Sequence, residues 1–279
     1  KKHFHETGTQ RIYQRFCLVL TNIKKAVEEI VRLDISPASA GAFIFLCKTK
    51  EDTQKDFEDK LKELSQIKFP KPVIIGTSKN FNEFFNYALE IAALKRVKST
   101  VDAIEGDAIA KKELNGRLTA YQNLLFNSLY LNFENADWTF NKNKVKENNL
   151  SAIASLISNE VFKLTPIIHN ELVVRDRLSS MSMSGASNLL NRVFNNSDLK
   201  NLGMEGNPSE FGIYLSLIKS NNLHIKKGDE FVISIENTNN KSIKTIYDEF
   251  LKLIKGSKEA VNVSDIYAHF VKQPYGIKI

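Results

Sequence analysis

The first third of the chain alternates between short apolar runs and stretches with helical spacing. Residues 15–20, 41–47 and 73–76 are short runs of mostly apolar side chains, which is typical of buried strands. Apolar positions then recur on one helical face in the segments that follow, which are residues 22–34, 51–66 and 80–97. Strand and helix therefore alternate three times, and this order favours a short parallel sheet with crossover helices.

The remainder of the chain shows mainly helical spacing. A long helical pattern starts after Asp107, and residues 136–145 alternate and turn at 141–143, which predicts a small β-hairpin that carries Trp138. From residue 149 the pattern is almost entirely helical, apart from a short strand at 231–235. We expect helices at 151–162, 166–178, 184–195, 209–219, 241–255 and 264–272.

These patterns define a fold class and three expected domains. The fold class is an α/β N-terminal part with a short parallel sheet and crossover helices, followed by a mostly helical domain. We expect an α/β domain at 1–97, a helical connector with a small β-hairpin at 98–148, and a helical module at 149–279.

Composition narrows the class of protein. No apolar run approaches the roughly 20 residues that a membrane span needs, and the N-terminus has no signal peptide. The two cysteines, Cys17 and Cys47, lie in apolar runs on two adjacent predicted strands, so we expect buried, reduced thiols in a cytoplasmic protein. The chain lacks an initiator Met, which suggests a piece of something longer.

The net charge of +7 leaves two interpretations open. An excess of positive charge favours contact with a polyanion, but the 39 basic residues are interspersed with 32 acidic ones. An ordinary solvated surface explains this balance as well.

The motifs of common enzymes are missing or incomplete. No Gly-x4-Gly-Lys-Ser/Thr string occurs, and the segment 76–79 has only the strand-to-helix context of a phosphate-binding turn. His169, His224 and His269 are far apart in sequence, and His3 and His5 stand in a terminus that we expect to be disordered, so we predict no metal site. We expect no catalytic residue, no cofactor and no activity from this chain alone.

The densest group of polar residues lies at 166–177. On a helix, Glu171 and Arg175 share a face at i and i+4, and Asn170 lies beside that stripe. A solvated ion pair and a polar network that docks this helix onto another domain both fit the spacing. The Ser-rich segment 179–187 that follows is either a flexible cap or a phosphate contact.

Three strings in this region have a family resemblance. They are Pro-Ile-Ile-His-Asn-Glu-Leu-Val-Val-Arg-Asp-Arg-Leu-Ser-Ser at 166–180, Leu-Gly-Met-Glu-Gly-Asn-Pro-Ser-Glu-Phe-Gly-Ile-Tyr-Leu-Ser-Leu at 202–217, and Pro-Tyr-Gly-Ile-Lys at 274–278. Their order and spacing resemble the C-terminal portion of large bacterial P-loop ATPases of phage-defence systems, of the BREX type and related ones. Val174 and Ser209 depart from the pattern of that family.

The resemblance implies a function for the chain. The Walker motifs, with ATP and Mg²⁺, would lie in the parent protein, and residues 149–279 would form a helical, winged-helix-like module. The chain would then be a non-catalytic part of the ATPase that contacts other subunits or parts of a defence complex, or DNA. Asn170, Glu171 and Arg175 would form the interface network, and the candidates for nucleic-acid contact are Arg175, Arg177, Arg192 and Lys219.

Two other functions stay open at this point. The first is a stand-alone nucleic-acid-binding protein that uses the helical module, which would bind DNA in a salt-dependent manner. The second is an enzyme with its site at the carboxyl ends of the three strands, where open α/β sheets place ligands. Thr21, Asn22, Lys48, Thr77 and Ser78 would line that edge.

Overall fold

The computed structural model describes most of the chain and divides it into two compact units. It describes residues 2–33, 35–36, 38–49, 51–78, 82–100, 106–170, 178–257 and 259–277. The sheet unit comprises residues 13–153, and the helical unit comprises residues 1–12 and 154–279. Within the described residues, no helix has the length and apolar character that crossing a membrane requires.

The sheet unit is built on the alternation that the sequence predicts. Its parallel strands are β1 (Tyr13–Leu20), β2 (Gly41–Lys48) and β3 (Val73–Thr77), and the helices that follow them are α2 (Ile23–Arg32), α3 (Gln54–Leu64) and α4 (Asn82–Thr100). The sheet continues through β4 (Asp137–Phe140) and β5 (Asn143–Lys144) in the order β1-β2-β3-β4-β5. The predicted hairpin around Trp138 therefore extends the sheet, pairing antiparallel to β3, and the sheet is mixed.

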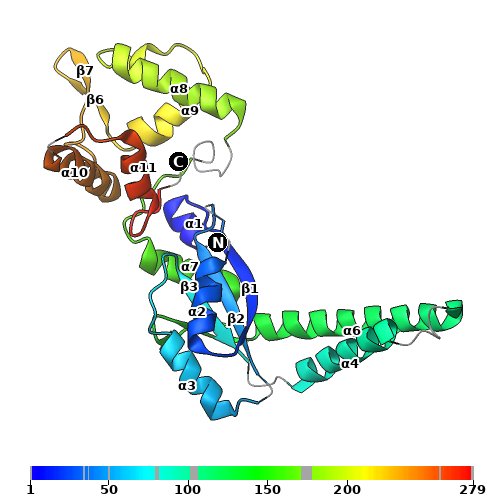
Figure 1. Cartoon of the computed structure of the whole chain (residues 1–279). Helices are drawn as coiled ribbons and strands as arrows, with labels where there is room; N and C mark the ends of the chain where they lie inside the picture. Colours follow the sequence, from blue (N-terminus) through cyan, green and yellow to red (C-terminus); the bar gives the residue numbers. More distant parts are fainter. Residues whose placement is uncertain are drawn as a thin grey trace. The chain divides into compact units, whose positions relative to one another are not determined.

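The side chains of the strands alternate between the two faces of this sheet. Ala42, Ile44 and Leu46 share one face of β2, while Phe43 and Phe45 share the other, because side chains alternate along a strand. The second face carries an aromatic cluster in which Trp138 contacts Phe43 and Phe133, each with ring centroids 5.0 Å apart. Helix α6 (Ala108–Glu134), which supplies Phe133, runs beside α4 and the pair extends well beyond the strands (Figure 1).

Gly76 is explained by this aromatic cluster. It pairs with Trp138 in the β3–β4 ladder, and a Cβ at residue 76 would lie 2.3 Å from Trp138 Cζ3. The indole ring thus occupies the space above the glycine, a close approach that any other residue would prevent. Packing against Trp138 therefore explains why residue 76 is a glycine, and no phosphate-binding role is needed to explain it.

The helical unit contains the N-terminal segment as well as the second half of the chain. Its elements are α1 (Lys2–Thr7), most of α7 (Leu150–Val161), α8 (Ser180–Asn195), the short helix η1 (Lys200–Gly203), α9 (Phe211–Ile213), the π-helix η2 (Tyr214–Lys219), the hairpin β6 (His224–Lys227) and β7 (Glu230–Ile233), α10 (Lys241–Gly256) and α11 (Val263–Val271). The expected fold class is confirmed: a sheet with alternating helices is followed by a mostly helical region with a small hairpin.

Two predictions about local structure in the helical unit are wrong. Residues 166–170 are not helical, because Ile168 N donates to Thr7 O and Ile167 N donates to Ser242 Oγ, so tertiary bonds replace the bonds of a helix. The expected start of the helix at 184 is also wrong, since α8 starts at Ser180 with Ser179 as its N-cap.

The N-terminus also differs from the expected disordered segment. Residues 2–7 form helix α1, and His3 is buried. Its Nδ1 donates to Asn159 Oδ1, while Arg11 Nε donates to His3 Nε2 over 3.4 Å. Both bonds are satisfied by a neutral imidazole with its proton on Nδ1.

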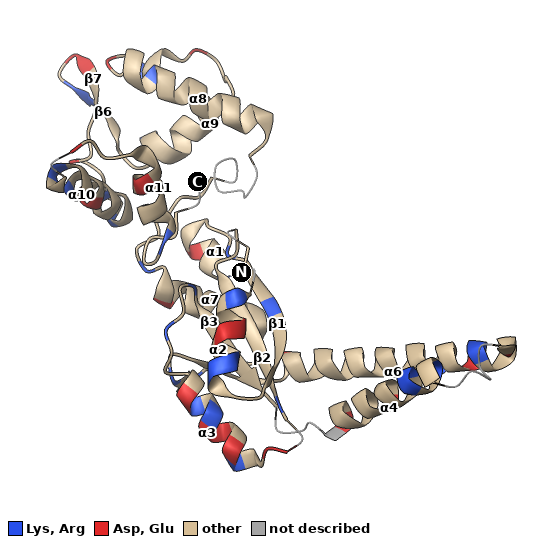
Figure 2. Ribbon diagram, in the orientation of Figure 1, with Lys and Arg blue, Asp and Glu red and all other residues tan. Residues whose placement is uncertain are grey.

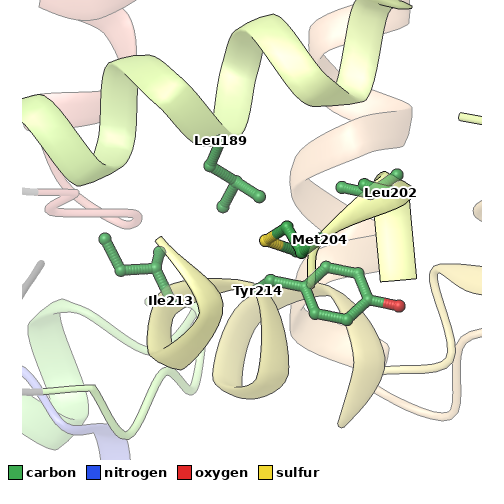
Figure 3. Packing of buried hydrophobic residues seen from close by; sticks show 5 residues of the cluster. All are labelled: Leu189, Leu202, Met204, Ile213 and Tyr214. Atoms are coloured by element: carbon green, nitrogen blue, oxygen red, sulfur yellow. The ribbon is translucent and has the colours of Figure 1, made fainter. Parts of the chain in front are cut away.

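The core of the helical unit joins α8 to the segments after it. Leu189 of α8 points toward Met204, Ile213 and Tyr214, and Leu202 closes the other end of the cluster (Figure 3). Leu202 has a left-handed backbone (φ 54°), which is costly for a branched side chain. Its complete burial offsets that cost and fixes the loop between α8 and α9.

Candidate interaction site

The three strings that carry the family resemblance come together in the helical unit. Asn170 in the first string donates through Nδ2 to Ser216 Oγ in the second. Thr165, which precedes the first string, donates through Oγ1 to the carbonyl oxygen of Tyr275 in the third over 2.6 Å. Segments separated by up to 110 residues thus meet through hydrogen bonds within one compact unit.

The predicted polar network is described only at Asn170. The Asn170 side chain is buried, and its partner Ser216 Oγ also lies within hydrogen-bond distance of Gly212 O and Ile213 O on α9. Glu171, Arg175 and Arg177 lie outside the described residues. Asn170 therefore connects the segment before residue 171 to the helix at 211–219, and the ion-pair part of the network stays a prediction.

Arg192 and Glu210 form an ion pair inside the helical unit. Arg192 Nε donates to Glu210 Oε1 over 2.9 Å, and the Glu210 side chain is only 4% exposed. Burial alone would raise the pKa of Glu210, but hydrogen bonds from its own backbone amide and from Arg192 outweigh it and hold the pKa below its usual range. The guanidinium of Arg192, a candidate for phosphate contact, is thus already bound to a buried carboxylate, whereas Lys219 is exposed.

A buried hydrogen-bond chain involving His224 was missed by the sequence analysis. The distance between Tyr214 Oη and His224 Nδ1 is 2.9 Å, and that between His224 Nε2 and the carbonyl oxygen of Ser197 is 3.0 Å. A carbonyl only accepts, so the His224 ring donates from Nε2 and accepts a hydrogen bond from the Tyr214 hydroxyl at Nδ1. These two hydrogen bonds connect η2, β6 and the loop after α8. Burial raises the pKa of the Tyr214 hydroxyl.

Helix α8 exposes a row of apolar side chains on the side away from its core contacts. Met183 is 54% exposed, Leu190 59% and Phe194 81%, at a spacing of seven and then four residues that places them on one helical face. Leu189 and Gly185 on the buried side pack toward Ile213. The sequence analysis missed this row, because a helix with apolar residues on two faces looks the same in sequence as one with a single wide apolar face.

The surface of α8 is also nearly free of charge. Arg192 is its only charged residue, and that side chain is paired with Glu210 (Figure 2). The contrast with α3 is clear, because α3 carries charged residues along most of its length (Figure 2). We call the row Met183, Leu190 and Phe194 the α8 stripe.

Several polar groups at the carboxyl edge of the sheet form hydrogen bonds within the sheet unit. The Asn22 side chain caps α2 by accepting from Lys25 N, Thr21 O accepts from Lys60 Nζ, and Thr77 Oγ1 donates to Leu46 O. Lys60 also pairs with Asp52 over 2.8 Å. Within the described parts of the chain, no group of three or more His, Cys, Asp and Glu side chains could hold a metal ion.

Comparison with known proteins adds no relative. No protein-family model, no curated protein and no solved structure matches this chain. The α8 stripe and the convergence of the three strings are therefore the observations on which a functional proposal can rest.

Proposed function

We propose that this chain is a non-catalytic part of a large P-loop ATPase of a phage-defence system, where it binds another protein part of that complex through the α8 stripe. The exposed row of Met183, Leu190 and Phe194 is the main support. Met and Phe are enriched in the cores of protein interfaces, from which charged residues are depleted. Apolar anchors spaced along one helical face are also how a helix docks into the groove of a partner.

The lack of charge on α8 supports a protein partner over a nucleic acid. Binding to a phosphate backbone depends on lysine and arginine side chains that neutralise it. The single arginine of α8 is engaged by Glu210, so the stripe has no cation to offer. The ATPase assignment rests on the resemblance of the three strings, and their meeting in one unit is consistent with a shared structural role.

Binding to the ATPase part is the direct test. The gene must encode a Walker A motif upstream of this segment, and that P-loop segment, produced separately, should bind the chain in a calorimetric titration. Phe194→Ser should weaken binding at least tenfold, since a buried aromatic anchor contributes about 2 kcal/mol or more. Met181→Ser is the matched control, because Met181 is 72% exposed on another face of the same helix.

Two results would contradict the proposal. One is a gene without a P-loop, and the other is an affinity that Phe194→Ser and Met181→Ser change equally. The proposal also requires that Mg-ATP leave the melting temperature of the isolated chain unchanged, because a ligand that binds only the folded state raises it.

Nucleic-acid binding is the second candidate. Helix α8, the α9–η2 helix and the β6–β7 hairpin follow one another in the order of a winged helix, and Lys219, Lys226 and Lys227 are exposed. DNA affinity that falls steeply with salt, and that Lys226→Ala with Lys227→Ala lowers, would favour this function over protein contact.

A further inference from the structure

The two cysteines of the chain form a close pair on the sheet. Cys17 on β1 and Cys47 on β2 have their sulfur atoms 3.7 Å apart, and both are free thiols. Cys17 is exposed and Cys47 half-buried, so the expectation of two buried thiols was wrong for Cys17. The side chain of Cys17 reaches solvent because β1 is an edge strand of the sheet.

The strand register disfavours a direct disulfide. Cys17 pairs with Phe45 and Cys47 pairs with Val19, so the two cysteines are diagonal neighbours on parallel strands. Neighbouring strands lie about 4.8 Å apart and two residues along a strand span about 6.6 Å, which places the two Cα atoms roughly 8 Å apart. Disulfides rarely join Cα atoms separated by more than about 7 Å, so a bond would require movement of the backbone.

The same spacing suits an atom held between the two sulfurs. Zinc binds thiolates at about 2.3 Å in a tetrahedron, whose corners are then about 3.8 Å apart. We propose that Cys17 and Cys47 are a bidentate thiolate site for a thiophilic divalent cation of the zinc and cadmium class. Two coordination positions would remain for water or for a ligand from another molecule, reached from the exposed side of Cys17.

Proton release accompanies binding at this site. Each thiol must lose its proton to become a ligand, so one metal ion displaces two protons. The two sulfurs lie within hydrogen-bond distance of each other, and either thiol can donate. The bound cation favours ionisation of both thiols.

Cadmium titration of the full chain tests the site. We expect one Cd²⁺ per chain, an ultraviolet thiolate-to-cadmium absorption band, and release of two protons in weakly buffered solution. Because the chain has no other cysteine, Cys17→Ser and Cys47→Ser address the two ligands separately. Each single variant should lose at least tenfold in affinity and bind no better than the double variant.

The opposite pattern would overturn the proposal. Two independent thiols would leave each single variant with about half of the bound cadmium, and binding elsewhere would survive in the double variant. Emission of Trp138, which lies in the same sheet unit, checks that the serine variants keep their fold. An unfolded variant is replaced by wild-type chain alkylated at exposed Cys17, for which the same loss is expected.

Discussion

At the scale of single residues, the helical unit is held by buried polar side chains whose partners come from distant segments. Glu210 depends on Arg192, Asn170 on Ser216, and His3 on Asn159. A buried polar group without its partner costs more than a hydrogen bond gains, so these pairs are sensitive points.

Arg192→Ala should destabilise the helical unit by about 2 kcal/mol, because it leaves the Glu210 carboxylate buried without its cation. Urea unfolding followed by circular dichroism measures the change. The exposed pair Arg117–Glu113 gives the comparison, and Arg117→Ala should cost much less than Arg192→Ala, apart from any change in helix propensity. Equal losses for the two variants would show that the Glu210 pair is not buried in solution.

Stability should also depend on the protonation of His3. Burial is the largest cause that lowers the pKa of His3, and the charge of Arg11 adds to it, against the Asn159 hydrogen bond and Glu6. The unfolded chain therefore takes up a proton near the ordinary value of 6.5 before the folded chain does. The free energy of unfolding should accordingly fall as pH drops below about 6.5 and level off below the folded pKa.

Unfolding midpoints of His3→Asn across that range test this dependence. The variant keeps a donor for Asn159 but does not titrate, so its midpoint should fall less with acid than that of the wild type. His5→Asn, at an exposed position in the same helix, should behave like the wild type. A slope unchanged in His3→Asn would contradict the role given to His3.

At the scale of elements, the sheet unit depends on the packing of β3, β4 and α6 around Trp138. The Trp138 ring is held between Phe43, Phe133 and Gly76, so it cannot move aside for a side chain at residue 76. The register of β4 is thus fixed by a side chain as well as by its ladder with β3.

Gly76→Ala should destabilise the sheet unit by about 1–3 kcal/mol, because the added methyl group would overlap the indole of Trp138. The emission of Trp138, the single tryptophan, reports this unfolding directly. Gly116→Ala on α6 is the matched control. Nothing lies within 4 Å of its Cβ position, and a helix gains up to about 1 kcal/mol from alanine, so this variant should be slightly more stable.

At the scale of the whole molecule, the helical unit is discontinuous in sequence. Arg11 donates to Thr165 Oγ1 and lies over the Phe162 ring at 4.3 Å, and Gly8 approaches the Ile168 carbonyl so closely that a Cβ would overlap it. The first twelve residues are therefore a structural part of a unit whose other residues start at 154.

Removal of residues 1–12 should lower the stability of the helical unit and leave the sheet unit nearly unchanged. The reason is that His3, Thr7 and Arg11 bond to the segment 159–168. Circular dichroism, which follows mostly helices, should show an earlier transition, while the Trp138 emission midpoint stays within error. An equal shift of the circular dichroism and Trp138 emission midpoints would contradict the assignment of residues 1–12 to the helical unit.

The sequence by itself determined those elements in which the spacing of apolar residues matches the face that is buried. The alternation of 15–20, 41–47 and 73–76 with helices, the hairpin at Trp138 and the helix at 241–256 follow from local spacing, because a side chain's face is set by the period of its element. The Asn22 and Asp107 caps are local features of the same kind, since a cap bonds within a few residues.

Only the tertiary structure decided which distant groups meet. Local spacing does not indicate that Ser242 and Thr7 accept the hydrogen bonds of residues 167 and 168, and so it predicted a helix from Pro166. It likewise could not separate the core face of α8 from the α8 stripe, or bring Cys17 to 3.7 Å from Cys47. These features depend on partners supplied by other segments, and local spacing carries no information about them.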